Sequence, residues 1–337
     1  EPAAEVEPAA EVEPAAEVEP AAEVEQEDLE GLGLTEEQMS KLNCNPEIDK
    51  DGDHVPDNLD VEGPVDWSYC NLNWAKLSNR DLSGANLEGA FLQRTHLNGT
   101  DLSGANLHDT NMRYAWLYDT NFSGADLSSS QIYKAFLGGD TTFDNANLSY
   151  ANLCAASLGF YVLTGTDLSH AAFDHAQLPG ADLSDAIVTY TNFYDSDLTG
   201  VNLSNKDLTG TILTGADLSN ANLENVDLSN MDLTGIILTG ADLSRSDLSN
   251  TILTGADLSN AVLEPTNLID ADLRNANLSD AHLKNSLLAD ANLSYAILTG
   301  ADLTNAVLTD AILTGANLEN AVLTNTILNC VGHPICI

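Results

Sequence analysis

Residues 216–225 read Ala-Asp-Leu-Ser-Asn-Ala-Asn-Leu-Glu-Asn, and this five-residue pattern decides the fold. The third position of each unit is leucine, the residue two positions earlier is small, and Asp or Asn stands between them. An apolar residue recurs at every fifth position over 72–137 and, after a shift of one residue across 138–142, again over 143–328. A period of five fits neither the 3.6 of an α-helix nor the 2.0 of a β-strand.

A short fixed period predicts stacked repeats. Each unit is expected to turn the chain through one corner and to place the leucine and the small residue inside. The Asp or Asn between them then points outward and accepts hydrogen bonds from nearby backbone amides at the turn. Many of the acidic residues are therefore predicted to be structural.

The Ala-(Asp/Asn)-Leu-X-X pattern resembles the pentapeptide-repeat family over residues 65–329. The resemblance implies an all-β fold, a right-handed quadrilateral β-helix with four units per coil. The two runs then make about 13 coils, and at ~4.8 Å per coil the solenoid is roughly 60 Å long.

Three residues break the pattern at the small inward position: Arg80, Tyr161 and Lys206. An unpaired charge among leucines costs several kcal/mol. We therefore expect these side chains to turn outward through a local distortion, with Tyr161 next to Phe160 as a bulge.

Outward apolar residues recur every 25 residues, which is one and a quarter coils. They step from one face to the next, so we expect no broad apolar binding face. The series is Val162, Ile187, Ile212, Ile237, Val262, Leu287 and Ile312.

The N-terminal segment 1–25 begins with four copies of Glu-Pro-Ala-Ala-Glu-Val. Proline every six residues prevents a continuous helix, so we expect an extended acidic tether of about 75 Å. It is either a leader without a task or a segment that docks on a partner. Residues 26–64 form a second module, in which Thr35-Glu36-Glu37-Gln38 predicts a capping box and a short helix.

An acidic loop in this module predicts a calcium site. The expected ligands are Asp49, Asp51, Asp53, Asp57 and Asp60, with the Val55 carbonyl. This spacing wraps oxygen atoms around one point, as Ca²⁺ requires. Compared with an EF-hand, Gly52 comes two positions early and Asp60 replaces the longer Glu. The loop resembles thrombospondin type 3 calcium repeats, which implies Ca²⁺ as cofactor and an extracellular setting; the alternative is an acidic linker.

The chain has five cysteines: Cys44, Cys70, Cys154, Cys330 and Cys336. We expect Cys330 and Cys336 to close a C-terminal loop over 330–337, and Cys44 to pair with Cys70. Cys154 is then the free thiol. This scheme requires an oxidising compartment.

Composition and motifs exclude several functions. With 52 acidic and 11 basic residues the net charge is −41, which opposes electrostatic binding to nucleic acid or anionic membrane. No apolar run reaches the ~20 residues of a membrane span. The sequence contains no phosphate loop or catalytic motif. His170 and His175 are predicted on adjacent faces, too far apart to share a metal ion.

These features predict a non-enzymatic structural or scaffolding protein, extracellular or on the cell surface, with the periplasm as an alternative. The chain begins at Glu1 without Met, which fits either removal of a leader or trimming of the chain. Its expected partners are proteins or further copies of itself. Only the short segment after Leu328, with Val331, Ile335 and Ile337, is available to cover the C-terminal tip. Either the solenoid joins head to tail into filaments, or the cysteine loop caps the end and the solenoid stays monomeric.

The second hypothesis follows from the family resemblance: a cytoplasmic DNA mimic that binds and protects DNA gyrase. The acidic charge agrees with it. However, the chain ends nine residues after Leu328, without the C-terminal helical segment that such proteins share, and a calcium loop fits poorly with cytoplasm. An unidentified binding module is the third reading.

Overall fold

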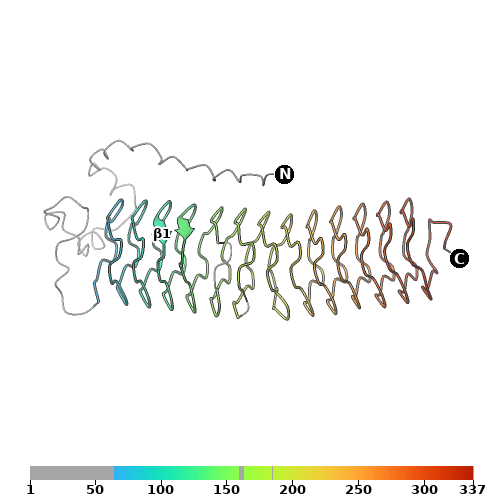
Figure 1. Ribbon diagram of the computed structural model, residues 1–337, viewed down its shortest axis with the longest axis horizontal. Coiled ribbons are helices and arrows are strands. Elements are labelled where there is room, and N and C mark those ends of the chain that lie inside the picture. The colour runs from blue at the N-terminus through green and yellow to red at the C-terminus, as the bar shows by residue number, and fades with distance from the viewer. Residues whose placement is uncertain (1–63, 159–162, 184, 337) are drawn as a thin grey trace, which may run out of the picture. The chain divides into compact units, whose positions relative to one another are not determined.

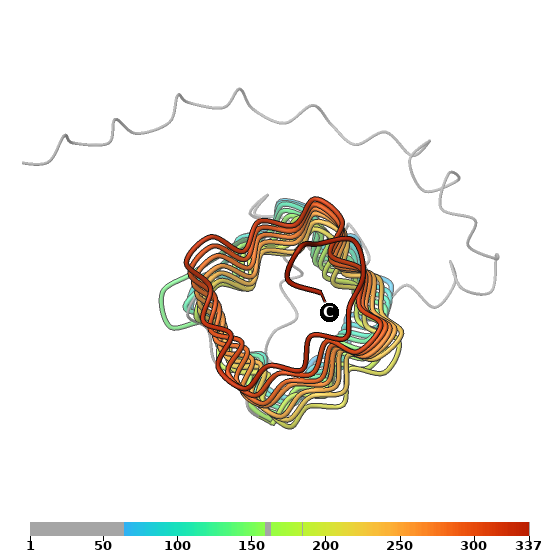
Figure 2. The ribbon, with the colours of Figure 1, turned by 90° about the vertical axis from the view of Figure 1, so that its right-hand side faces the viewer.

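The computed structural model describes residues 64–158, 163–183 and 185–336. The chain divides into two units, Glu1–Lys41 and Leu42–Ile337, and all described residues belong to the second. They form a solenoid of stacked, four-sided coils (Figures 1 and 2). The predicted helix, the calcium loop and the module boundary at 25 lie outside the described residues, and these features and the boundary at 64 stay predictions.

Parallel pairing between successive coils builds the four walls. Outward residues 20 positions apart form bridges, from Asp66 with Asn86 to Val307 with Ile327. Two strands of three residues extend this pairing: β1, Trp116–Tyr118, runs parallel to β2, Phe136–Gly138. Twenty residues are four repeat units, so each unit supplies one wall. The described residues contain no helix.

Ladders of leucine and small residues fill the interior. Every central side chain from Leu72 to Leu313 is buried. Where the small residue is Thr or Ser, its hydroxyl in most cases donates a hydrogen bond to a carbonyl of the preceding coil, whereas Thr110, Ser196 and Thr251 donate to the carbonyl three residues earlier. The Thr95 hydroxyl, for example, lies 2.7 Å from the Leu72 oxygen. The buried hydroxyl groups at this position, except that of Ser130, are thereby satisfied without disturbing the apolar core.

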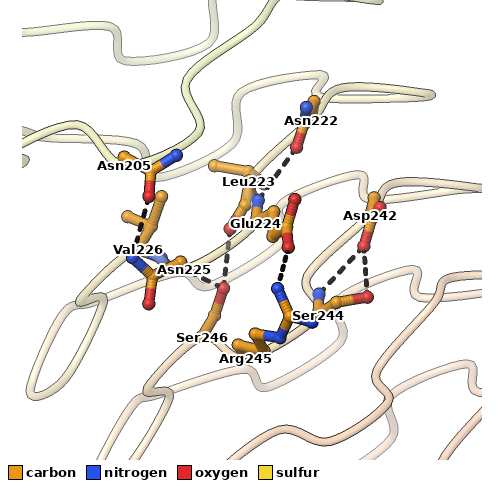
Figure 3. Close-up of polar contacts among 10 residues, drawn as sticks. All are labelled: Asn205, Asn222, Leu223, Glu224, Asn225, Val226, Asp242, Ser244, Arg245 and Ser246. Carbon is orange, nitrogen blue, oxygen red and sulfur yellow. Dashed lines mark hydrogen bonds and ion pairs between the residues drawn. The ribbon is translucent and has the colours of Figure 1, made fainter.

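The outward Asp and Asn residues fasten the turns, as the sequence predicts. The Asp242 carboxylate accepts from the Ser244 amide at 2.9 Å and from its hydroxyl at 2.6 Å, and Asn222 accepts from the Glu224 amide at 3.0 Å (Figure 3). Two residues after most central positions the backbone adopts positive φ, as at Asn220 (φ 57), and Pro265 is an exception because its ring keeps φ negative. Gly, Asn and Asp tolerate this conformation best, which explains their frequency there.

One extra residue at a corner accounts for the shift in the repeat. The bridge from Asn121 reaches Thr142, 21 residues on, instead of the usual 20. Thr141 then occupies the small inward position, and its hydroxyl donates to the Leu117 carbonyl at 2.6 Å. The coil absorbs the insertion and the stacking continues in register.

The expected distortion occurs at Lys206. The Lys206 ammonium donates to the Ala186 carbonyl at 2.9 Å. Elsewhere the backbone carbonyl of the small inward residue accepts a hydrogen bond from the amide 21 residues later, as the Ala156 carbonyl does from the Gln177 amide. Asp207, which holds the equivalent position on this wall, forms none of the described bridges. The Lys206 ammonium therefore occupies the carbonyl that would otherwise accept from the Asp207 amide, and the parallel pairing of this wall is interrupted there.

The other two exceptions have different outcomes. Arg80 is half-buried, but Asp81 keeps its bridge to Asp101 and the Arg80 carbonyl accepts from the Asp101 amide at 2.9 Å. The expected distortion at Arg80 was wrong, because the backbone stays in the ladder there. Tyr161 lies outside the described residues.

Candidate interaction surfaces

The outer surface of the described residues contains no cluster of three His, Cys, Asp or Glu side chains that would hold a metal ion. His170 and His175 are engaged separately. The His170 ring stacks between Tyr150 and Tyr190, with centroid separations of 4.5 and 4.8 Å. His175 lies 3.9 Å from the Asp195 carboxylate. Within the described part of the chain, no helix is long and apolar enough to cross a bilayer.

A column of aromatic and basic side chains runs along one corner of the first four coils. Its members, one per coil, are Trp74, Arg94, Tyr114 and Lys134. The Arg94 guanidinium lies between two rings, 4.7 Å from the Trp74 centroid and 5.7 Å from that of Tyr114. Such cation–π contacts hold the long arginine side chain in one orientation.

A second column lies on the next wall, two residues further along each coil. The His96 and Trp116 rings stack at 5.5 Å, and the Trp116 and Phe136 rings lie 5.0 Å apart. Trp116 and Phe136 are 40% and 43% exposed. These outward positions differ from the others on the repeat, which are mainly Asp and Asn.

A shallow hollow of about 420 Å³ adjoins the corner column. It is lined by Gln93, Arg113, Tyr114, Tyr133 and Asn152. The Tyr133 ring meets Tyr114 edge to face at 6.0 Å, and Arg113 donates to the Gln131 side chain at 3.2 Å. The floor of the hollow is thus a fixed network of rings and amides.

Charge sets this surface apart from the rest of the molecule. Five of the eleven Lys and Arg residues fall within 76–134. The segments that form these two walls contain only two acidic residues, Asp119 and Asp140: 71–80, 91–100, 111–120 and 131–141. We call the side chains at 74, 94, 113, 114, 133 and 134, with those at 96, 116 and 136, the aromatic–basic surface. The sequence analysis missed it, although a search at 20-residue spacing reveals both columns.

The C-terminal tip is the second distinctive surface. The central leucines of the last coil are only partly buried: Leu318, Leu323 and Leu328. Outward residues Val322, Ile327 and Val331 are 43%, 51% and 52% exposed. Leu287, Val307 and Ile327 also pair in one row. The 25-residue series does step between walls as expected, but the sequence analysis missed this apolar row.

The C-terminal segment folds across the end of the solenoid (Figure 2). The predicted disulfide between Cys330 and Cys336 is present, with a Cα separation of 4.8 Å. Ile335 and Cys336 pack against the core from this loop. The loop covers part of the tip and leaves the three last leucines half-exposed.

The remaining cysteines agree with the prediction where they are described. Cys154 is a free thiol that donates to the Asp174 carboxylate at 3.4 Å. Burial, followed by this hydrogen bond and the Asp174 charge, raises the pKa of Cys154 to about 11. Cys70 is disulfide-bonded. Its predicted partner, Cys44, lies outside the described residues.

Comparison with known proteins identifies the repeat. The family model described as Pentapeptide repeats matches eight segments, 70–109, 105–139, 146–185, 162–200, 191–230, 228–264, 266–305 and 301–331. A comparison with curated proteins found no match.

Solved structures similar to this chain carry the same repeat. HetL of the cyanobacterium Nostoc sp. strain PCC 7120 is 28% identical over 80% of this chain and 94% of its own, with a TM-score of 0.21. Rfr23 of Cyanothece 51142 is 29% identical over 43% of this chain and 90% of its own, with a TM-score of 0.14. QnrB1, a plasmid-mediated fluoroquinolone resistance protein, is 16% identical over 53% and 89%, with a TM-score of 0.29. Because the family model matches well over half of the residues, the chain belongs to the pentapeptide-repeat family, and its solenoid is a right-handed quadrilateral β-helix.

Proposed function

We propose that this chain is a non-enzymatic, exported scaffold: a stiff acidic solenoid that presents partner-binding walls and joins to further copies through its C-terminal tip. The observation that carries the proposal is the incompletely covered last coil. The disulfide between Cys330 and Cys336 supports export, because such bonds persist in oxidising compartments. The continuous apolar interior supports a scaffold, because a filled solenoid offers walls and little concavity.

Among the described residues, the central amides of the last coil make none of the hydrogen bonds to a following coil that such amides make in most earlier coils. In preceding coils the central amide donates to the next coil, as Leu298 does to the Asn317 carbonyl at 2.7 Å. Leu318, Leu323 and Leu328 have no following coil within the described residues. Open amides beside half-buried leucines form an edge that favours pairing with another chain.

The occupant that fits this edge is the first coil of a second copy. It has the same square section, and its outward residues repeat the spacing of every other coil. A copy stacked in register would continue all four ladders and bury the exposed leucines. This contact is heterologous, so it extends into a filament instead of closing. The competing reading is that the cysteine loop suffices as a cap and the solenoid stays monomeric.

Light scattering and analytical ultracentrifugation test the proposal on the full chain at high protein concentration, with and without millimolar calcium, and on a chain cut after Leu328. We expect concentration-dependent assemblies that the substitution Ile327→Lys abolishes. Ile187→Lys is the matched control, because Ile187 is an outward isoleucine of the same wall type with 50% exposure, far from the tip. Monomers under every condition would refute the assembly.

Two further experiments address the other parts of the proposal. Calcium binding to residues 49–60 stays a prediction, and calorimetry of the full chain against an Asp51→Asn/Asp53→Asn variant measures it.

A gyrase supercoiling assay separates the scaffold hypothesis from the DNA-mimic hypothesis. We expect no protection of gyrase, since two walls of the first four coils hold only two acidic residues, Asp119 and Asp140, and therefore do not imitate a duplex.

A further inference from the structure

We propose that the aromatic–basic surface of the first four coils binds an extended acidic peptide segment in which glutamates alternate with proline and small apolar residues. This deepens the scaffold proposal, on which it rests, by naming the chemistry of the partner that one wall carries. The inference comes from three features of the surface: its cations, the orientation of its rings and the scarcity of acidic residues.

The cations are exposed and held in place. Lys76, Arg94, Arg113 and Lys134 are all exposed, on a pair of walls with only two acidic residues, Asp119 and Asp140, within a chain of net charge −41. Arg94 is fixed between two rings, and the Lys134 ammonium lies 5.1 Å from the Tyr133 ring. Pre-oriented cations lose little side-chain freedom when a carboxylate binds. A local positive field on an acidic molecule also selects for an anionic partner.

The rings present their edges to solvent. Each ring face in the column of His96, Trp116 and Phe136 is turned toward the ring of the next coil, with an interplanar angle of 5° for the first pair and 35° for the second. An aromatic ring is negative on its face and positive at its edge. The exposed edges therefore combine an apolar border with a weak preference for carboxylate oxygens.

This geometry disfavours the two other classes of anionic partner. Single-stranded nucleic acid is held by bases that stack on open ring faces, and here neighbouring coils occupy those faces. A polyanion of that charge density would also meet the acidic walls on either side. A sulfated glycan lacks the apolar groups that the ring edges and the hollow beside Tyr114 would bury.

An extended peptide matches the surface on each count. Proline-rich segments adopt an extended helix without internal hydrogen bonds and dock in grooves lined by aromatic residues. Glutamates between the prolines would reach Arg94 and Lys134, while alanine and valine side chains lie against Trp116 and Phe136. Such a segment carries few enough charges to approach one wall of an acidic solenoid.

Fluorescence anisotropy with a labelled synthetic peptide tests the inference. The probe is (Glu-Pro-Ala-Ala-Glu-Val)₄, a sequence of the required composition. The full chain and a chain beginning at Gln26 are both titrated, so that the copies within residues 1–24 do not mask binding by competition. We expect saturable binding that weakens as salt rises from 50 to 300 mM, roughly as exposed charge pairs are screened. A peptide with Gln in place of Glu should not bind.

Charge-neutral variants locate the site. Arg94→Gln/Lys134→Gln should weaken binding about tenfold or more, whereas Arg245→Gln/Lys284→Gln, which removes the same two charges from later coils, should change it less than about twofold. Trp116→Ser should also weaken it. Circular dichroism and thermal melting confirm that each variant remains folded.

The outcomes are decisive for the acidic-peptide assignment. No binding to either chain length, equal binding of the Gln peptide, or unchanged binding by Arg94→Gln/Lys134→Gln would each overturn it. Tighter binding of a dT₂₄ oligonucleotide or a heparin fragment than of the peptide would assign the surface to another class of partner. Because the peptide assay reports on this wall alone, its failure leaves head-to-tail assembly untouched, and Ile327→Lys should not affect peptide binding.

Discussion

The first four coils and the last four share one interior and differ in their exteriors. Leu97 and Leu298 are both fully buried in the same ladder. Outside, the early coils carry Arg94, Trp116 and Phe136, whereas the late coils carry Asp and Asn turns and exposed aliphatic residues. The comparison shows that two inward positions and one turn position determine this fold. The other positions of each unit are free to differ between coils and to bind partners.

The strongest test of a common interior is a pair of core truncations, one in each region. Leu97→Ala and Leu258→Ala each remove a fully buried leucine. We expect each to lower the free energy of unfolding by about 3 kcal/mol, through lost burial and the cavity left behind. Guanidinium denaturation followed by hydrogen exchange measures both, since stacked repeats need not unfold as one unit. A twofold difference between the two sites would show that the interiors are not equivalent.

The second test concerns the boundary between the regions, where Cys154 lies. Because its pKa is raised to about 11, the reactive thiolate is scarce at neutral pH. At pH 8 we expect its reaction with a disulfide reagent to be roughly a hundredfold slower than that of an ordinary thiol, rising with pH until about 11. Asp174→Asn removes the carboxylate, so the pKa should fall and the rate at pH 8 should rise. Asp217→Asn, which removes a carboxylate elsewhere, is the control. The prediction is contradicted if Cys154 of the unsubstituted protein reacts as fast as an ordinary free thiol.

The third test compares two glycines that occupy positive-φ turn positions at corners of the solenoid. Gly104 has φ +64 with open space around it, whereas a Cβ on Gly210, at φ +68, would come 2.3 Å from the Tyr190 ring. Gly104→Ala should therefore cost only the strain of a left-handed residue, about 1 kcal/mol. Gly210→Ala should cost about 1 kcal/mol more, because the ring must leave its stack on His170.

A double-mutant cycle separates strain from ring displacement at this corner. Replacing Tyr190 with Ser in the Gly210→Ala background should recover the additional loss and leave the cost seen at Gly104. Equal destabilisation by the two glycine substitutions in the starting protein would contradict the role of the ring.

The interior was predictable because it repeats every five residues, and this period is visible directly in the sequence. The family, the burial of the leucines, the Asp and Asn turns, the Cys330–Cys336 pair and the free Cys154 all followed from local position in the unit. The aromatic–basic surface did not, because Arg94 meets Trp74 and Tyr114 only after four units bring them to the same corner. Surface columns have a period of 20, and the inserted residue near 140 shifts even that spacing.

The distortions show a second limit of sequence reasoning. Arg80 and Lys206 occupy the same small inward position, so the pattern alone assigns both the same outcome. Lys206 opens its wall, because its ammonium reaches the Ala186 carbonyl and displaces a ladder bond. Arg80 keeps its bond to the Asp101 amide. The difference depends on which carbonyl the cation reaches, and that is a property of the folded coil.

The smallest expected effect comes from repairing the irregular wall. Lys206→Ala restores the small residue that most units carry, and it frees the Ala186 carbonyl to accept from the Asp207 amide. Burial lowers the pKa of Lys206, although Asp185 and Asp182 act in the opposite direction, so the charged ammonium is disfavoured in the folded state. A lysine whose pKa is depressed by folding destabilises the protein while it is protonated, and this cost fades as pH rises above the folded pKa.

We therefore expect Lys206→Ala to stabilise the protein modestly, by less than about 1 kcal/mol, because solvent screens the half-buried side chain. Its benefit should be larger at pH 7 than at pH 11, where unchanged Lys206 has already lost charge. Amide exchange at Asp207 and Leu208 should slow, while exchange at Leu97 stays constant. Faster exchange at Asp207 would show that the lysine holds this wall together, and that the irregular coil is a built feature of the solenoid.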